Sequence, residues 1–133
     1  MKKGKAFRIK GTLTTAIIGD DATVTGLLLT GMGERTKKGE TNFLTVDKDT
    51  TLAQIEAKFR SFLERDDIGI ILINQHIAEE IRNLIAEHEA VIPTILEIPS
   101  KDYPYDPEKD SILVRAARNL FGADNASEKL RDI

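Results

Sequence analysis

Residues 68–122 read IGIILINQHIAEEIRNLIAEHEAVIPTILEIPSKDYPYDPEKDSILVRAARNLFG and determine the fold class that we expect. Ile68–Ile73 is an apolar run without alternation, which is typical of a strand buried on both faces in a parallel sheet. A helical pattern follows over Ile77–His88, with apolar side chains at spacings of three and four. Thr94–Ile98 is a second β-like run. The stretch therefore predicts a strand–helix–strand unit, the building block of α/β proteins.

The residues before this stretch repeat the alternation. Leu13–Gly19 predicts a buried strand, and the acidic pair Asp20-Asp21 after it predicts a helix start. Asn42–Val46 predicts a further strand, and Thr51 and Gln54 have the spacing of a capping box. The order βαβαβαβ predicts an α/β fold with a four-stranded parallel sheet and flanking helices, Rossmann-like or receiver-like.

Composition divides the chain into five segments. They are a basic tail (1–12), an α/β domain (13–98), a proline-rich spacer (99–107), an amphipathic helix (108–122) and a polar tail that we expect to fray (123–133). Pro99, Pro104 and Pro107 favour an extended spacer, which spans roughly 25 Å in polyproline geometry. We therefore expect the last helix to project from the domain.

The helix after the spacer carries an apolar stripe. A helix of this length is marginal alone in water, so it must pack on something. One interpretation is that it folds back onto its own sheet. The spacer favours the other interpretation, a helix offered to a partner's groove or coiled coil. The candidate partner-binding residues are Ile112, Leu113, Ala116, Ala117, Leu120 and Phe121.

Bulk properties limit the possible functions. The chain has 133 residues, which suits one domain with appendages. It has no Cys, which excludes disulfides and thiolate metal sites, and its net charge of −3 argues against general nucleic-acid binding. No apolar run approaches the roughly 18 residues that span a membrane, and no apolar segment follows the N-terminal lysines as in a signal peptide. The basic start is either a solvated tail or a docking arm for an anionic partner.

Asp20 and Asp21 follow the first strand, at the edge where open α/β sheets bind ligands. Paired carboxylates there can hold Mg²⁺, as in phosphoacceptor receiver domains. A receiver also needs an aspartate after the third strand, and this chain has Asn74. The alternative function is therefore a degenerate receiver-like domain that binds a regulatory partner.

Other chemistry finds no support in the sequence. Gly31 and Gly33 follow a helix instead of preceding one, so they do not match a dinucleotide-binding turn. His76 and His88 lack the spacing of paired metal ligands. No phosphate-binding Gly-Lys-Ser/Thr motif and no nucleophile elbow is present. We therefore expect no catalytic residue, no cofactor and no metal.

Several longer sequence motifs resemble those of one family. They are TGLLL at 25–29, RDDIGIILINQHIAEEIR at 65–82, TILEIPSKDYPYDPEKDS at 94–111 and RNLFG at 118–122. In these motifs the chain closely resembles the F subunit of the eukaryotic vacuolar-type proton-pumping ATPase (V-ATPase). The resemblance covers about residues 13–122.

The resemblance implies a non-catalytic component of the pump's central rotor stalk, which couples ATP hydrolysis to rotation and proton translocation. The implied partners are the coiled coil of the D subunit, the catalytic hexamer of A and B subunits and the membrane-sector connector below the stalk. The loop after the first helix, Gly33–Thr41, contacts the D subunit in the family, and here it carries Arg35, Lys37 and Lys38. The implied location is peripheral, on the cytosolic face of vacuolar or endosomal-type membranes, without membrane insertion.

Overall fold

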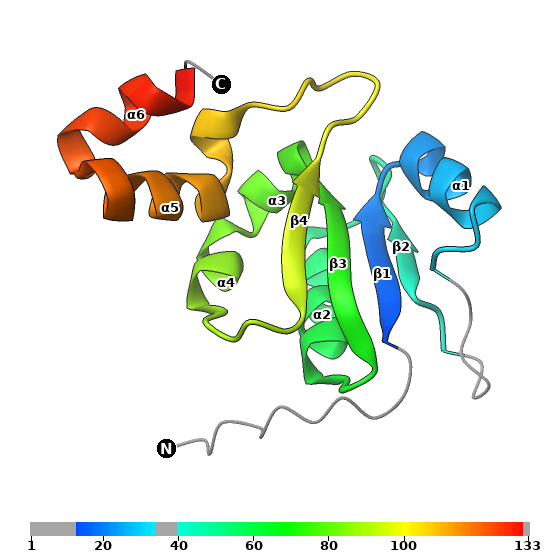
Figure 1. Ribbon diagram of the computed structural model, residues 1–133. Helices are drawn as coiled ribbons and strands as arrows, with labels where there is room; N and C mark the ends of the chain where they lie inside the picture. Colours follow the sequence, from blue (N-terminus) through cyan, green and yellow to red (C-terminus); the bar gives the residue numbers. More distant parts are fainter. Residues whose placement is uncertain (1–12, 34–39, 132–133) are drawn as a thin grey trace.

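The structure is a computed structural model that describes residues 13–33 and 40–131. Four parallel strands form one sheet in the order β2-β1-β3-β4 (Figure 1). The strands are β1 (Thr14–Gly19), β2 (Phe43–Thr45), β3 (Ile68–Asn74) and β4 (Thr94–Ile98). The predicted four-stranded parallel sheet is therefore confirmed.

The register places apolar side chains in rows across the sheet. Ile17 on β1 lies opposite Phe43 on one side and Leu72 on the other. Leu72 in turn lies opposite Leu96 on β4. Because side chains alternate along a strand, each row belongs to one face of the sheet.

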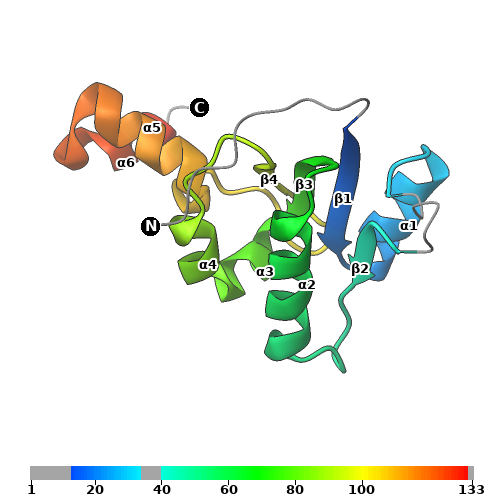
Figure 2. The ribbon, with the colours of Figure 1, turned by 90° about the horizontal axis from the view of Figure 1, so that it is seen from below.

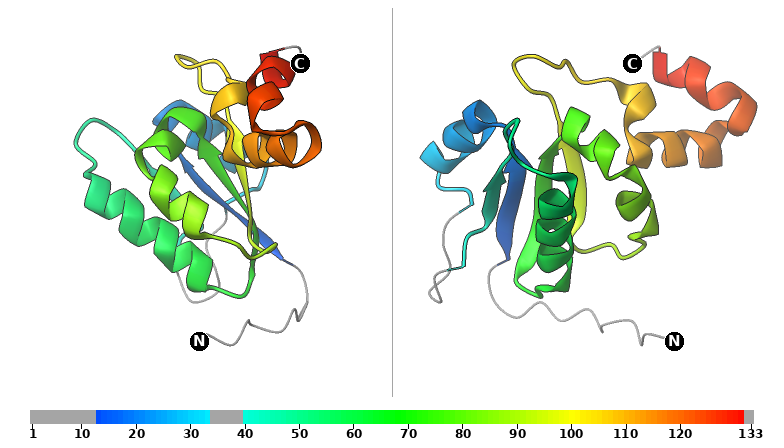
Figure 3. Two further views of the ribbon diagram at one scale, coloured as in Figure 1. Left: turned by 90° about the vertical axis from the view of Figure 1, so that its left-hand side faces the viewer. Right: turned by 180° about the vertical axis from the view of Figure 1, so that it is seen from behind.

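Helices flank both faces unequally. Helix α1 lies over β1 and β2, whereas α2, α3 and α4 lie on the opposite face, as the views from below and from behind show (Figures 2 and 3). The helices are α1 (Asp21–Leu29), α2 (Leu52–Glu64), α3 (Gln75–Glu80), α4 (Arg82–Glu87), α5 (Ser111–Phe121) and α6 (Ala123–Arg131), with a 3₁₀ turn η1 (Pro107–Lys109).

The main core fills the space between the sheet and α2–α4. Its largest buried side chains come from both layers and are fully shielded from solvent. Burying each large apolar side chain contributes about 1.5–3 kcal/mol, so this layer supplies most of the fold's stability. Core members include Ile18, Ile55, Phe59, Phe62, Ile71, Ile73, Ile77 and Ile81.

The capping box at the start of α2 is confirmed. The backbone N–H of Gln54 donates to the Thr51 hydroxyl at 3.2 Å, and the Thr51 N–H donates to the Gln54 side chain at 2.9 Å. Each bond satisfies a backbone donor that has no partner within the helix.

The expected helix over Ile77–His88 begins earlier and is broken. Gln75–Glu80 and Arg82–Glu87 form two short helices, α3 and α4, that meet at Ile81. The Ile81 N–H bonds to the Ala78 carbonyl at 3.1 Å, three residues back instead of four, so the chain tightens there. The break leaves Ile81 fully buried.

The expectation that 123–133 frays is wrong for most of that segment. Residues Ala123–Arg131 form α6, which packs against α5 as a helical hairpin beside α4 (Figures 1 and 3). Ala126 and Leu130 are four residues apart and both buried, at 3% and 4% exposure. Such a pair makes one narrow apolar face, which is enough to cover a neighbouring helix. Within the described part of the chain, no helix has the length and apolar character that a membrane crossing needs.

Candidate functional site

The helix that carries the predicted partner-binding stripe begins at a well-defined cap. The carboxylate of Asp110 accepts the backbone N–H groups of Ile112 at 3.0 Å and Leu113 at 3.4 Å. Its other oxygen accepts the Tyr105 hydroxyl. Burial and this hydrogen bond to a carboxylate raise the pKa of Tyr105 well above its ordinary value, so the phenol stays protonated as the donor. The start of α5 is therefore fixed by the chain itself.

One side of α5 is already occupied within the molecule. Leu113, Val114 and Ala117 pack against Ala126 and Leu130 of α6. Of the predicted contact residues, Leu113 and Ala117 thus face the other helix of the hairpin. The pattern of α5 alone does not indicate this role; the signal for it is the four-residue spacing of Ala126 and Leu130.

The other side of α5 is exposed. Ile112 is 46% exposed, Leu120 is 75% exposed, and Ala116 between them is also exposed. Their spacing of four residues places them along one line of the helix, which we name the outer stripe. Phe121, also 46% exposed, lies at the hairpin end, where the Lys129 ammonium sits 5.6 Å from its ring centre. The six predicted residues therefore divide between an inner and an outer side.

The basic loop predicted as a second contact includes Arg35, Lys37 and Lys38. These three residues lie outside the described residues. The two ends of the loop Gly33–Thr41 are described, and Gly33 is buried beside Ile17 and Leu28.

The first residue of the hairpin, Ser111, is hydrogen-bonded to an ion pair within the domain. The Glu97 carboxylate on β4 binds the Arg82 guanidinium on α4 through two bonds of 2.9 Å. The same carboxylate accepts the backbone N–H of Ser111 at 3.2 Å. The Glu97 side chain is 2% exposed and Arg82 is 29% exposed, so the pair is shielded on the carboxylate side. Two-bonded pairs of this kind fix orientation as well as distance.

The spacer is tied to the domain rather than extended away from it. Gln75 binds the backbone of Asp106 twice, through its amide oxygen and its amide nitrogen, each at 2.6 Å. The Asn74 amide donates to the Pro99 carbonyl at 3.2 Å. The His76 ring stacks on Tyr103 with centres 4.3 Å apart. The spacer therefore loops over the end of the sheet (Figure 1), and the expected straight reach is wrong.

The acidic end of β1 has a structural role. The Asp20 carboxylate accepts the Thr23 N–H at 2.8 Å and caps α1, while the Asp20 N–H donates to the side-chain oxygen of Asn74 at 2.8 Å. Partial burial acts to raise the pKa of Asp20, but the hydrogen bonds from Thr23 and the charges of His76 and Lys101 bring it below its ordinary value. Among the described residues, no three His, Asp or Glu side chains come together as a metal site would require.

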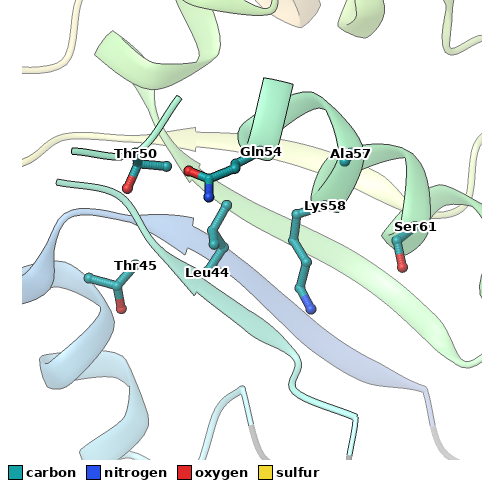
Figure 4. A pocket seen from close by; sticks show the side chains of 7 residues that line it. All are labelled: Leu44, Thr45, Thr50, Gln54, Ala57, Lys58 and Ser61. Atoms are coloured by element: carbon teal, nitrogen blue, oxygen red, sulfur yellow. The ribbon is translucent and has the colours of Figure 1, made fainter. Parts of the chain in front are cut away.

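A groove lies between β2 and α2 (Figure 4). Among the described residues that line it, only Lys58 is charged, and its ammonium donates to the Thr41 hydroxyl at 3.1 Å. The lining residues are Leu44, Thr45, Thr50, Gln54, Ala57, Lys58 and Ser61.

Comparison with known families identifies one match. The model for the family of the ATP synthase (F/14-kDa) subunit matches residues 15–115, which include the whole α/β domain from Thr15 and the start of α5.

Curated relatives resemble the chain over most of their own length. A human protein named as the F subunit of the V-type proton ATPase is 59% identical over 110 residues, covering 83% of this chain and 92% of that protein. A Dictyostelium discoideum protein of the same name is 54% identical over 113 residues, covering 85% of this chain and 93% of its own length. Among solved structures, the F subunit of the V-type ATP synthase from Archaeoglobus fulgidus is 21% identical with a TM-score of 0.47, covering 65% of this chain and 98% of that chain.

Proposed function

The chain belongs to the family of the ATP synthase (F/14-kDa) subunit, as an F subunit of the eukaryotic V-type proton ATPase, and from that premise we propose that it is a non-catalytic part of the pump's central rotor stalk. In this role it transmits torque between the ATP-hydrolysing A/B hexamer and the proton-translocating membrane sector. Its partners are then the coiled coil of the D subunit, the hexamer above and the membrane-sector connector below.

The observation that carries this proposal is the outer stripe of α5. Ile112, Ala116 and Leu120 form an apolar line on a helix whose inner side is already satisfied by α6. An amphipathic surface of this kind fits the seam of a coiled coil, where apolar side chains enter holes between facing residues. Burying one large aliphatic side chain there contributes roughly 1.5–3 kcal/mol. Ile112 and Leu120 together thus supply a substantial part of an attachment.

The polar edge of the sheet supports a structural role. Asp20, Asn74 and Gln75 direct their side chains to the protein's own backbone, where each caps or ties a segment. In an open α/β sheet this is the edge where a ligand would bind. Because these side chains are hydrogen-bonded to the protein's own backbone, they hold α1 and the spacer in place, as a part that transmits torque requires.

The proposed location follows from the same family membership. We place the chain on the cytosolic face of vacuolar or endosomal-type membranes, as a peripheral part of the assembled pump. It reaches the membrane sector through other components of the pump, without inserting into the bilayer itself.

A double substitution in the outer stripe tests the proposal. Ile112→Asp with Leu120→Asp places two carboxylates where the account expects apolar contacts, and each carboxylate adds a desolvation cost. We expect a folded chain that co-purifies poorly with the D subunit, and membranes with reduced proton pumping. Arg118→Asp, on another side of α5, is the control and should have a smaller effect.

The contradicting result is equally specific. If the double variant binds the D subunit and supports pumping like the parent, the outer stripe is not the attachment. The segment around Arg35, Lys37 and Lys38 would then be the leading candidate for the contact.

A further inference from the structure

The apolar surface of α5 is wider than the outer stripe. Leu113 and Ala117 directly follow Ile112 and Ala116 in the sequence, so the inner and outer sides are neighbouring rows on one helix. Together the two rows make a band of the width that an amphipathic helix normally buries. In the structure, α6 covers the inner row and leaves the outer row exposed. One row of the band is therefore covered by the chain's own last helix.

A coiled-coil seam needs residues from both rows. Helices that wind around each other bury apolar residues at alternating spacings of three and four, which average 3.5 residues. Leu113, Ala116 and Leu120 have these spacings, whereas the outer stripe alone has a spacing of four throughout and drifts around the helix. Of these three residues, Leu113 packs against α6. The seam is therefore incomplete as long as α6 stays in place.

Helix α6 is held to α5 by few contacts. Ala126 and Leu130 are its buried apolar side chains among the described residues. The ion pair between Arg131 and Glu108 is 2.8 Å long, but its side chains are 70% and 40% exposed, and exposed pairs contribute little to stability. A helix of nine residues is also marginal by itself in water. A longer helix that offers more apolar contacts can therefore replace α6.

The junction between the two helices is a single glycine. Gly122 separates the last residue of α5 from the first residue of α6 and has a φ of 81°, a backbone conformation that glycine adopts at little cost. A side chain at this position would meet no described atom within 4 Å, so close packing is not the reason for the glycine. Glycine also reaches the other backbone conformations that a different placement of α6 needs. The junction therefore suits a helix that changes its position.

We propose that α6 is a displaceable cover: it shields the inner side of α5 in the free chain and is replaced by a helix of the partner's coiled coil when the chain joins the stalk. The completed contact surface then consists of Leu113, Val114 and Ala117 together with the outer stripe. The match to the family ends at residue 115, so the residues that place the chain in the family do not include α6. The inference rests on the proposed function, because the coiled coil of the D subunit supplies the helix that replaces α6.

A distance measurement tests the displacement directly. Because the chain has no cysteine, Lys109→Cys and Glu128→Cys allow two spin labels at exposed positions, one on η1 and one on α6. Pulsed electron paramagnetic resonance should give one short distance in the free full-length chain, because α6 contacts η1 as well as α5. Addition of the D subunit should lengthen this distance. An unchanged distance in the complex would show that α6 stays on α5 and would overturn the proposal.

Substitutions on α6 should change the affinity for the D subunit. Leu130→Asp removes the docking of α6 without altering the surface of α5, so the D subunit no longer has to displace α6. We expect binding that is roughly tenfold tighter, the factor equivalent to one buried leucine. Asn125→Asp, which adds the same carboxylate at an exposed position of α6, is the matched control and should leave the affinity unchanged. Equal or weaker binding by Leu130→Asp would contradict the proposal.

The outcomes separate this inference from the proposed function. If the parent chain binds the D subunit and the label distance does not change, the displacement of α6 is wrong, while attachment through the outer stripe stands. If the distance lengthens while the Ile112→Asp and Leu120→Asp double variant binds like the parent, the inner side is the contact and the role given to the outer stripe is wrong. If the parent chain does not bind the D subunit, the proposed function is wrong and this inference with it.

Discussion

The carboxylate of Glu97 and the guanidinium of Arg82 form a two-bonded ion pair, 2.9 Å at each contact, that also holds the first residue of α5. It connects β4, α4 and the C-terminal hairpin at one point. Ile112 and Arg115 of α5 also border a pocket with α4 and the start of β4, so this pair helps to determine where α5 and its outer stripe are presented.

Replacing the carboxylate should loosen the hairpin. Glu97→Gln removes the charge that Arg82 pairs with and weakens the bond to Ser111. Hydrogen bonds to charged groups contribute about 1.5–3 kcal/mol, so a loss of roughly 2 kcal/mol is expected, since Arg82 keeps some access to water. Chemical denaturation measures the loss, and hydrogen exchange should show faster exchange across α5 and α6. Glu89→Gln, at an exposed position, is the control, and an equal loss there would argue against the ion pair.

Replacing Asn74 by aspartate, which has nearly the same shape but carries a charge, should destabilise the fold. Its amide oxygen accepts from the Asp20 N–H, and its amide nitrogen donates to Thr23 and to the Pro99 carbonyl. Asn74→Asp removes the donor group and places a buried carboxylate against a carbonyl oxygen. With each unsatisfied buried group costing about 1–3 kcal/mol, the free energy of unfolding should fall by roughly 2–4 kcal/mol. Thermal melts compare it with Asn83→Asp on α4, which is exposed and should change little.

Asp20 should make stability depend on acid pH. The folded pKa of Asp20 lies below its ordinary value of 3.8, so its contribution is present at neutral pH and is lost as the pH falls through the folded pKa. Asp20→Asn keeps a good N-cap and should remove that part of the acid dependence. Asp20→Ala should cost about 1 kcal/mol at neutral pH. Denaturation curves recorded from neutral pH down through the folded pKa test both, and an unchanged acid slope in Asp20→Asn would contradict the assignment.

Leu130 should be needed for the hairpin but not for the domain. It is 4% exposed and packs on α5, so Leu130→Ala should destabilise the hairpin by roughly 2 kcal/mol. Hydrogen exchange should rise over α5 and α6 while β1, β3 and β4 stay protected. Leu29→Ala, at a side chain that is 85% exposed, serves as the control. Loss of protection throughout the sheet would show that the hairpin is part of the domain's cooperative unit.

The strands can be predicted because their runs of apolar residues indicate burial. The bounds predicted for Thr94–Ile98 match the observed strand, and Ile68–Ile73 lacks only Asn74 of β3. Runs of β-branched and aliphatic residues bounded by polar ones leave few alternatives. The break at Ile81 contains no Gly or Pro, so the helical pattern around it does not indicate it.

The α5–α6 hairpin could not be predicted from local sequence, and neither could the hydrogen bonds from Gln75 and Asn74 to distant backbone groups. Ala126 and Leu130 are two apolar residues in a polar segment, and their burial depends on α5 lying beside them. Gln75 and Asn74 bind backbone groups 31 and 25 residues away, at Asp106 and Pro99. Such pairings depend on the assembled fold, whereas periodicity reports only local structure. The division of the predicted stripe into an inner and an outer side follows from the same missing neighbour.

The rotor claim has a direct test, because the chain has no cysteine. Lys48→Cys, at an exposed position before α2, offers a single attachment point for a bead in the assembled ATPase, with the A/B hexamer fixed to a surface. The account predicts that the bead turns continuously in one direction when ATP is added and stops when ATP is removed. A bead that stays fixed on this chain, in complexes where a bead on the D subunit rotates, would contradict it.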